Sequence, residues 1–529
     1  MNQKFKEITE YLVQQKGWTK EQAEEIGPQC QWNRSLMEKA YADLCLDKQN
    51  LKVSQNSLLQ NDFQVQNYNQ WELDENEQYE QALKASQYQQ DTQPASKRKK
   101  YDDYPVGMQN LGNTCYLNCL IQLLFYNPKL VEQILQYKIP ESSQSGEILQ
   151  ISKKFIIELQ VVFSNQIMSN QKYFKPSQFN DAAKNLEKKV KNIIQQNNDF
   201  MDVSEYFAVL MELIDLSLNK QFIKQHNKLT IFQNEQLEKQ YIIKSEEQHQ
   251  FLWEMGIKNY QIYNFLNKEI IENQRKIKEL PENLVFSLER NIQKNNRKIE
   301  KTEEKFYFPN NLHLDFILGD IQASQKVEKY IKEQLKTLEV YQQLNKQTEA
   351  FEKVLIYYES LPMFDAFILR NLKFEYQKKV EELNKQFPLN YEFLNQELQN
   401  TSKNLYQLAQ IVVHTGSILH GHYYLYQYNF YLKKWFKYND TEVVIQTEQE
   451  VMADSIKNGN ILIYLSQEQK REVYSYQKEL NEIDKIRDQL KPNNNVNNLL
   501  KKIPKEIYEN ILKENEQFLN KYGEEIKDC

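Results

Sequence analysis

Apolar residues recur at three- and four-residue steps along several stretches of this chain, which is the spacing of a helix that packs one face on a core. In the first half, this spacing predicts helices over residues 115–126, 147–165 and 202–218. Runs of branched and aromatic residues predict strands further along. These strands are expected at residues 283–290, 306–308, 410–414, 423–432, 434–439 and 461–465. The central region therefore mixes helices with strands.

Residues 322–400 have a different character. From Val327 to Tyr358 apolar residues continue at helical spacing, and Phe364–Phe387 repeats the pattern after Pro362. This predicts two long amphipathic helices. A helix of about 35 residues spans roughly 50 Å, more than a small domain, so part of its apolar stripe needs a partner. We expect the pair to project from the fold and to make the protein a homo-oligomer, most simply a dimer.

Helical patterns also flank the central region. Residues 1–50 predict short helices, residues 72–88 predict one helix with an acidic start, and residues 467–529 predict a charged helical tail. Residues 89–103 read as a linker with the basic run Lys97–Lys100. A solvated linker and a nuclear import signal both explain this run.

Composition narrows the class of protein. The net charge of −6 over 529 residues argues against nucleic acid as the main partner. The first 25 residues lack the apolar core of a signal peptide, and no apolar run approaches the ~18 residues of a membrane span. Five cysteines, an odd number in a large chain, argue against a disulfide scaffold. We expect a reducing compartment, cytoplasmic or nuclear, and no membrane association.

Glycine and histidine are scarce here, with 11 and 6 residues; four of the glycines fall in two short windows, and three of the histidines lie in the second window. In the first, Gly107–Phe125, a loop rich in Gly, Asn and Thr feeds a helix that has Cys115 at its first turn. The helix dipole and unpaired N–H groups favour a thiolate there. Asn110 lies upstream, where its amide could stabilise an oxyanion together with the Cys115 N–H. Cys119, one turn further, reads as a small buried hydrophobe.

The second window is His414–Tyr426, followed by a strand that ends in Asn439 and Asp440. A glycine-bounded turn delivers His422 onto a strand of alternating aromatic residues. A thiolate needs a base, and the base needs a third group to fix its tautomer. Adjacent strand residues point to opposite faces, so only one of Asn439 and Asp440 should face the imidazole directly. We expect Asn439 to do so, with Asp440 as support or as the alternative third member.

A metal site is the alternative interpretation of His414, His420 and His422. These three histidines have no acidic or thiol ligand at metal spacing, and the chain contains no CxxC pair for a zinc ribbon. We therefore expect no metal and no other cofactor.

The two windows resemble the Cys box and the His box of the ubiquitin-specific proteases, a papain-like cysteine peptidase family. Between them, further segments match the family in order, beginning at Pro176, Phe200, Leu280 and Phe308. The resemblance implies an α+β papain-like fold with thumb, palm and fingers over residues 104–466, interrupted by the helical insertion 322–400. Met201 replaces a glutamine that is usual in the family, and the absence of zinc-ribbon cysteines implies fingers that fold without metal.

This resemblance also implies a function, the thiol-dependent hydrolysis of isopeptide and peptide bonds at the C-terminal glycine of ubiquitin. It makes Cys115 the nucleophile and His422 the general base. Asn439 takes the third position and Asn110 the oxyanion-hole position, with Asp440 in a supporting role. Ubiquitin and ubiquitinated proteins are the implied partners.

Two acidic residues and two flanking segments extend the resemblance. Asp202 and Glu205 fall where the family binds the arginines of the ubiquitin tail, and residues three apart share a helix face. Residues 72–91 resemble a ubiquitin-interacting motif, in which Ala82, Leu83 and Ser86 would contact ubiquitin. Residues 1–50 resemble a ubiquitin-associated domain.

The order of these parts is most similar to the branch of the family that contains ubiquitin carboxyl-terminal hydrolases 25 and 28. A catalytically inactive ubiquitin-binding scaffold is the rival interpretation. The intact set of Cys115, His422 and Asn439 favours an enzyme, because a scaffold has no physical need of it.

Overall fold

The computed structural model describes residues 94–138, 147–194, 202–218, 229–359 and 367–527, with short gaps inside the last two ranges. The chain divides into two compact units, of which the smaller contains residues 338–384 and the larger contains the other described residues. The predicted domain at 1–50 and the motif with Ala82, Leu83 and Ser86 lie outside the described residues, as do Met201 and His420.

The larger unit is built on a mixed sheet, which has eight strands in the described part of the chain. Its strands, in spatial order, are β16 (Glu442–Gln446), β15 (Lys434–Asn439), β14 (Gly421–Asn429), β13 (Leu405–Gly416), β17 (Gly459–Ser466), β9 (Asn283–Glu289) and β7 (Trp253–Gly256), and β12 (Asn311–His313) also pairs with β13. Successive residues of β13 and β17 enter two different apolar cores, because strand side chains alternate between faces. The centre of the sheet is therefore covered on both sides.

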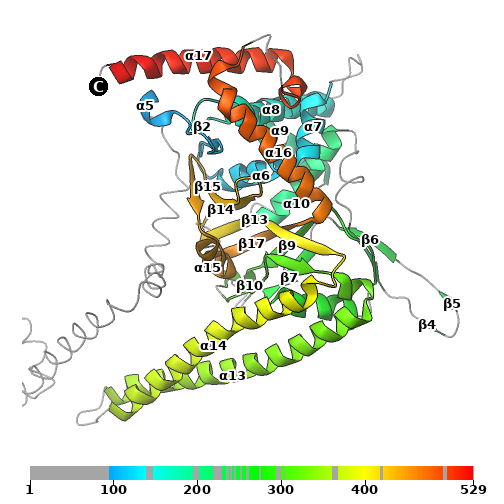
Figure 1. Cartoon of the computed structure of the whole chain (residues 1–529), viewed down its shortest axis with the longest axis vertical. Helices are drawn as coiled ribbons and strands as arrows, with labels where there is room; N and C mark the ends of the chain where they lie inside the picture. Colours follow the sequence, from blue (N-terminus) through cyan, green and yellow to red (C-terminus); the bar gives the residue numbers. More distant parts are fainter. Residues whose placement is uncertain are drawn as a thin grey trace, which may run out of the picture. The chain divides into compact units, whose positions relative to one another are not determined.

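Helices cover the first face of the sheet (Figure 1). They are α6 (Cys115–Phe125), α7 (Pro128–Gln136), α8 (Glu147–Met168), α9 (Ser177–Ile194), α10 (Val203–Ser217), α16 (Gln467–Ile486) and α17 (Lys505–Lys527). Helix α6 packs on β14 and β15, while α8 contacts α7, α9, α10, α16 and α17. Helix α7 begins at Pro128, whose missing N–H costs nothing at that position, and the Asn127 side chain caps it.

The second core lies under α12 (Ile262–Leu266), α15 (Glu448–Asn458) and the ends of two long helices. A capping box of Thr447 and Glu450 starts α15. Smaller strands complete this unit. They are β1 (Gly107–Met108) with β2 (Tyr173–Phe174), β3 (Leu229–Gln233) with β6 (Glu246–Gln250) and β8 (Lys276–Glu279), β4 (Leu237–Glu238) with β5 (Tyr241–Ile242), and β10 (Asn291–Gln293) with β11 (Ile299–Lys301).

The predicted long helices are α13 (Ile321–Glu359) and α14 (Phe367–Gln399). In the larger unit, Val327 and Leu394 join the second core. In the smaller unit, the rings of Phe351 and Tyr376 lie 5.3 Å apart and Lys373 pairs with Glu352, so the two helices pack against each other. Phe374 is 66% exposed. Apolar residues of these two helices are thus buried in the larger unit and exposed at Phe374 in the smaller unit. The homo-oligomer inferred from such an exposed apolar stripe stays a prediction.

Two local predictions are wrong. Residues 306–308 form no strand, and Tyr307 makes only an isolated bridge to Gln261. From Pro94 onward, the expected linker is instead ordered, with the short helix α5 (Ala95–Arg98). Lys100 is buried against Asp484 of α16, a residue 384 positions away that no local pattern reveals.

Candidate active site

The loop that carries the cysteine is folded around Asn110, which is fully buried. Its Oδ1 accepts hydrogen bonds from the backbone N–H groups of Gly112 (2.9 Å) and Thr114 (3.3 Å). Gly112 has φ +91°, a left-handed conformation that favours glycine. At Gly107 a Cβ would lie 2.6 Å from the carbonyl oxygen of Asp440, so only glycine permits this close approach. The loop therefore delivers Cys115 to the first position of α6.

The Cys115 thiol is only 3% exposed. Burial raises its pKa to about 12, although the backbone N–H groups of Tyr423, Tyr116 and Cys115 itself lower the pKa through hydrogen bonds. The predicted thiolate stabilisation by the helix start is present, but desolvation outweighs it. In the substrate-free site the neutral thiol is therefore the main form, and a base has to remove its proton. Cys119 is buried, as expected of a small hydrophobe.

His422 lies near the start of β14, directly after Gly421. Its Nε2 is 2.6 Å from Oδ1 of Asn439, the last residue of β15. An amide oxygen only accepts, so this contact assigns the ring proton to Nε2. Nδ1 is buried and has no hydrogen-bond partner among the described residues. It is the basic nitrogen, and the next residue along, Tyr423, donates its N–H to the Cys115 sulfur.

Asp440 also reaches this centre. The strand ends at Asn439, and Asp440 follows in a left-handed conformation with φ 53°. Its Oδ2 lies 4.0 Å from Nε2 of His422. The carboxylate accepts hydrogen bonds from the amides of Asn110 (3.0 Å) and Asn118 (2.7 Å). The expected alternation of faces does not apply beyond the strand, so both residues lie beside the imidazole. Burial raises the pKa of Asp440, while His422 and the two amides lower it.

The sequence analysis missed Asn118, which lies one turn after Cys115. Its amide also approaches the carbonyl oxygens of Met108 and Gln109 (3.4 Å each). Gln122, four residues on, donates to the Val106 carbonyl oxygen at 2.8 Å. The sequence did contain a signal for these contacts, because Asn118 and Gln122 lie at helical spacing on an otherwise apolar helix. A buried amide needs a hydrogen-bond partner, so two such residues indicate polar contacts made by this helix.

The two acidic residues differ in their surroundings. Asp202 precedes α10, and its Oδ1 accepts a hydrogen bond from the Tyr423 hydroxyl at 3.4 Å. Burial raises the pKa of Asp202, against hydrogen bonds that lower it. Glu205 is exposed in the first turn of α10. Tyr423, a second residue that the sequence analysis missed, thus links Asp202 to the cysteine.

His414, on β13, lies against the start of β14. Its ring stacks on Tyr423 with centroids 4.2 Å apart. Burial, followed by the electrostatic influence of Lys301 and of the neighbouring His422, lowers the pKa of His414 to about 3. A Cβ at Gly421 would lie 1.7 Å from Nε2 of His414, so the histidine fills the space that this glycine leaves. Among the described residues, no group of three or more His, Cys, Asp or Glu side chains is arranged to hold a metal ion.

A thiol at a helix start, an imidazole and an asparagine oxygen form the catalytic arrangement of papain-like cysteine peptidases. The family model for ubiquitin carboxyl-terminal hydrolase matches residues 106–464, well over half of the chain. The protein therefore belongs to the ubiquitin carboxyl-terminal hydrolase family, and the mixed helices and sheet fit the α+β fold that the resemblance implied.

Individual relatives match over shorter segments. Ubiquitin carboxyl-terminal hydrolase 28 of Homo sapiens is 29% identical over 120 residues, which cover 22% of this chain and 11% of that protein. The Gallus gallus protein of the same name is 30% identical over 111 residues, 20% of this chain and 11% of its own. Ubiquitin carboxyl-terminal hydrolase 12 of Saccharomyces cerevisiae is 28% identical over 127 residues, 23% and 10% of the two chains.

The alignments thus span about a tenth of the curated relatives' length. They confirm the predicted similarity to the branch with hydrolase 28. Separately, no helix in the described residues combines the length and apolar character that crossing a membrane requires.

Proposed function

We propose that this protein is a deubiquitinase, which hydrolyses isopeptide and peptide bonds at the C-terminal glycine of ubiquitin. The observation that carries this proposal is the state of His422. Its Nε2 is fixed by Asn439 at 2.6 Å, while its buried Nδ1 has no hydrogen-bond partner among the described residues, and the N–H of the adjacent Tyr423 donates to the Cys115 sulfur. Family membership supports ubiquitin as the substrate.

In the proposed reaction, Nδ1 of His422 removes the thiol proton as the Cys115 sulfur attacks the glycine carbonyl carbon. Because the pKa of the thiol is raised to about 12, little free thiolate exists before this transfer. The tetrahedral intermediate then breaks its C–N bond, and the imidazolium donates its proton to the leaving lysine amine. Water hydrolyses the resulting thioester, with His422 again as the base, and ubiquitin is released.

The oxyanion is stabilised by the Cys115 N–H and by the Asn110 side chain. One amide hydrogen of Asn110 is held by Asp440, which fixes the orientation of the amide plane. The amide held in this orientation is the side-chain donor to the oxyanion. A preorganised donor of this kind contributes roughly 3 kcal/mol to transition-state stabilisation. Asp440 is in this view a positioning residue for Asn110, and Asn439 is the partner of the base.

The tail of ubiquitin carries arginines, for which Asp202 and Glu205 supply the carboxylates. Asp202 is the closer to the reaction, because Tyr423 contacts both it and Cys115. In family terms, the helices on the first core act as the thumb, the sheet of β13 and β14 as the palm, and β3, β6 and β8 as metal-free fingers. Residues 72–91, with Ala82, Leu83 and Ser86, would add a second ubiquitin contact.

The test is the release of a fluorophore from the C-terminus of ubiquitin by purified full-length protein. Activity that disappears in Cys115→Ala, while this variant keeps its ubiquitin affinity and its melting temperature, is the expected result. Binding of ubiquitin without turnover by the wild-type protein would support the inactive scaffold instead.

A further inference from the structure

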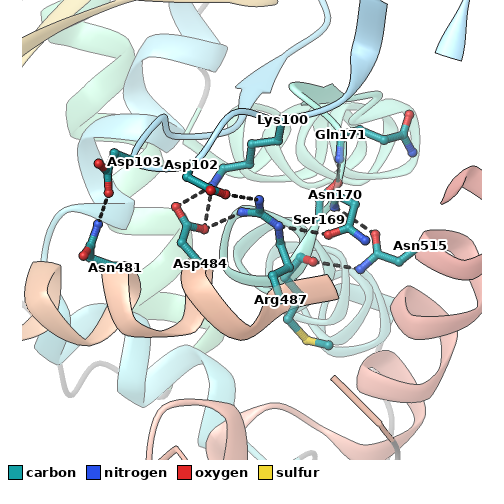
Figure 2. Close-up of polar contacts among 11 residues, drawn as sticks. Lys100, Asp102, Asp103, Ser169, Asn170, Gln171, Asn481, Asp484, Arg487 and Asn515 are labelled. Carbon is teal, nitrogen blue, oxygen red and sulfur yellow. Dashed lines mark hydrogen bonds and ion pairs between the residues drawn. The ribbon is translucent and has the colours of Figure 1, made fainter. Parts of the chain in front are cut away.

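Residues Lys100, Asn170, Asp484, Arg487 and Asn515 form a polar cluster, here called the polar clasp, which contains none of the catalytic side chains. Figure 2 shows it between the segment before β1, the turn before β2 and the C-terminal helices. It uses part of the basic run that the sequence analysis interpreted as an import signal or a solvated linker.

Asp484 is the centre of the polar clasp. Nζ of Lys100 lies 2.5 and 2.6 Å from its two carboxylate oxygens. Nη1 of Arg487 lies 2.5 Å from Oδ1 of the same carboxylate. The side chains of Lys100 and Arg487 are each 3% exposed, and both contact the partly buried carboxylate of Asp484 (Figure 2). Nη2 of Arg487 also lies 3.8 Å from the exposed carboxylate of Asp102. Such a buried group is maintained only if its partners stay in place, because a buried charge without a partner is costly.

Two asparagines connect this charged centre to the turn before β2. Nε of Arg487 donates to Oδ1 of Asn170 at 2.9 Å. The Asn170 backbone N–H donates to Oδ1 of Asn515 in α17, and the Asn515 amide donates to the Met168 carbonyl oxygen at 2.8 Å. The Lys100 backbone N–H in turn donates to the Asn170 carbonyl oxygen at 2.9 Å. The tail helices, the turn and the start of the domain are thus joined at one place.

From this turn, backbone contacts lead directly to the active site. The Gly107 N–H donates to the Lys172 carbonyl oxygen at 2.6 Å, and β1 pairs with β2 in parallel. The next residue, Met108, donates its N–H to the Asp440 carbonyl oxygen at 2.9 Å. Asp440 holds Asn110 and lies beside His422. Few contacts therefore separate the polar clasp from the catalytic centre.

We propose that the polar clasp positions the catalytic centre, by fixing the turn before β2 so that β1 holds the Asp440 turn in place. The helices α16 and α17 are then a working part of the catalytic unit. This inference rests on the proposed function, and it assigns positioning roles to Lys100, Asp484, Arg487 and Asn515. Burial lowers the pKa of Lys100 to about 8, and Asp484 opposes this shift, so the ion pair depends on its buried geometry.

The experiment uses the full chain and two variants of the polar clasp. Lys100→Met removes one charge and keeps the apolar stem, and Asn515→Ala removes a neutral link. Asp484 is left intact, because its loss would remove the carboxylate that both buried cations contact and leave only the exposed Asp102 near Arg487. Ile511→Ala is the matched control, since Ile511 is a buried apolar residue of the same helix as Asn515. Lys100→Arg tests rescue by a retained charge.

Four quantities are measured for each variant: the melting temperature, the fraction of active sites titrated with a ubiquitin that carries a C-terminal electrophile, and kcat and KM on the ubiquitin reporter. We expect kcat per active site to fall by about tenfold in Lys100→Met and Asn515→Ala, because small misplacements of reacting groups have effects of this size or larger. KM should change little. Ile511→Ala should lower the melting temperature and leave kcat per active site unchanged, and Lys100→Arg should recover much of the rate.

Unchanged kcat per active site in both polar clasp variants would overturn the inference, whatever happens to their melting temperatures. Failure of the proposed function is a separate result, namely no turnover by the wild-type protein. In that event the rate of Cys115 alkylation by iodoacetamide, followed by peptide mass spectrometry, still tests the positioning. The two variants must then differ from Ile511→Ala in this rate, and identical rates would refute the inference.

Discussion

The division of labour between Asn439 and Asp440 gives the sharpest test of the active site. Asn439→Ala removes the acceptor that lies 2.6 Å from Nε2 of His422. The imidazole then loses the bond that fixes its tautomer and orientation. For an uncharged partner we expect kcat/KM to fall by roughly 100-fold, equivalent to about 2.7 kcal/mol in the activation free energy. Asn439 is half-buried at the end of β15, so the melting temperature should change little.

Asp440→Ala should act differently, because this carboxylate accepts from two buried amides at 3.0 and 2.7 Å. A hydrogen bond to a charged group contributes about 1.5–3 kcal/mol of stability, and the substitution removes two of them. We therefore expect a loss of roughly 3–6 kcal/mol in the free energy of unfolding, together with a fall in kcat as Asn110 loses its orientation. Asp440→Asn is the matched control, since its oxygen still accepts one of the two hydrogen bonds.

The assay combines kcat/KM on the ubiquitin reporter, titration of active sites and urea unfolding for all three variants. The reasoning predicts a kinetic defect without a stability defect in Asn439→Ala, and both defects in Asp440→Ala. If Asn439→Ala were nearly wild type while Asp440→Ala lost orders of magnitude in kcat at unchanged stability, Asp440 would be the third catalytic member.

Three further predictions concern other parts of the chain. The pKa of His414 is lowered from 6.5 to about 3, so between these pH values the ring is protonated in the unfolded chain and neutral in the native protein. The corresponding stability is present above pH 6.5 and is lost as the pH falls toward 3, by about 2 kcal/mol at pH 5. Urea unfolding across this range should show that slope, and a wild-type slope in His414→Phe would contradict the assignment. Ala82 and Ser86, changed together to charged residues, should weaken binding to ubiquitin chains and spare the monoubiquitin reporter, because avidity needs both contacts; equal losses in both assays would indicate a structural role. Residues 322–400 should give a dimeric mass in light scattering, and Phe374→Asp, at a 66% exposed position, should reduce this mass; a monomeric wild-type protein at micromolar concentration would count against the oligomer.

Local sequence features were sufficient for most of the elements and pointed to the candidate catalytic residues. The helix predicted at 115–126 is α6, Cys115–Phe125, and the strand predicted at 434–439 is β15. Apolar spacing and glycine-rich turns act over a few residues, so the sequence displays them directly. The candidate Cys, His and Asn residues stand out because their loops carry a distinctive local pattern, and the structure brings His422 and Asn439 together.

Only the tertiary structure decided how these residues are tuned. Burial raises the pKa of the Cys115 thiol by more than the backbone N–H groups at the helix start lower it. How deeply the thiol is buried depends on the packing of distant elements. The alternation of side chains between the two faces of β15 does not extend to Asp440, because the strand ends at Asn439 and Asp440 has a positive φ. Lys100 meets Asp484 across 384 positions. Desolvation and contacts between distant segments arise from the three-dimensional packing of the whole unit, and a local pattern of residues does not contain that information.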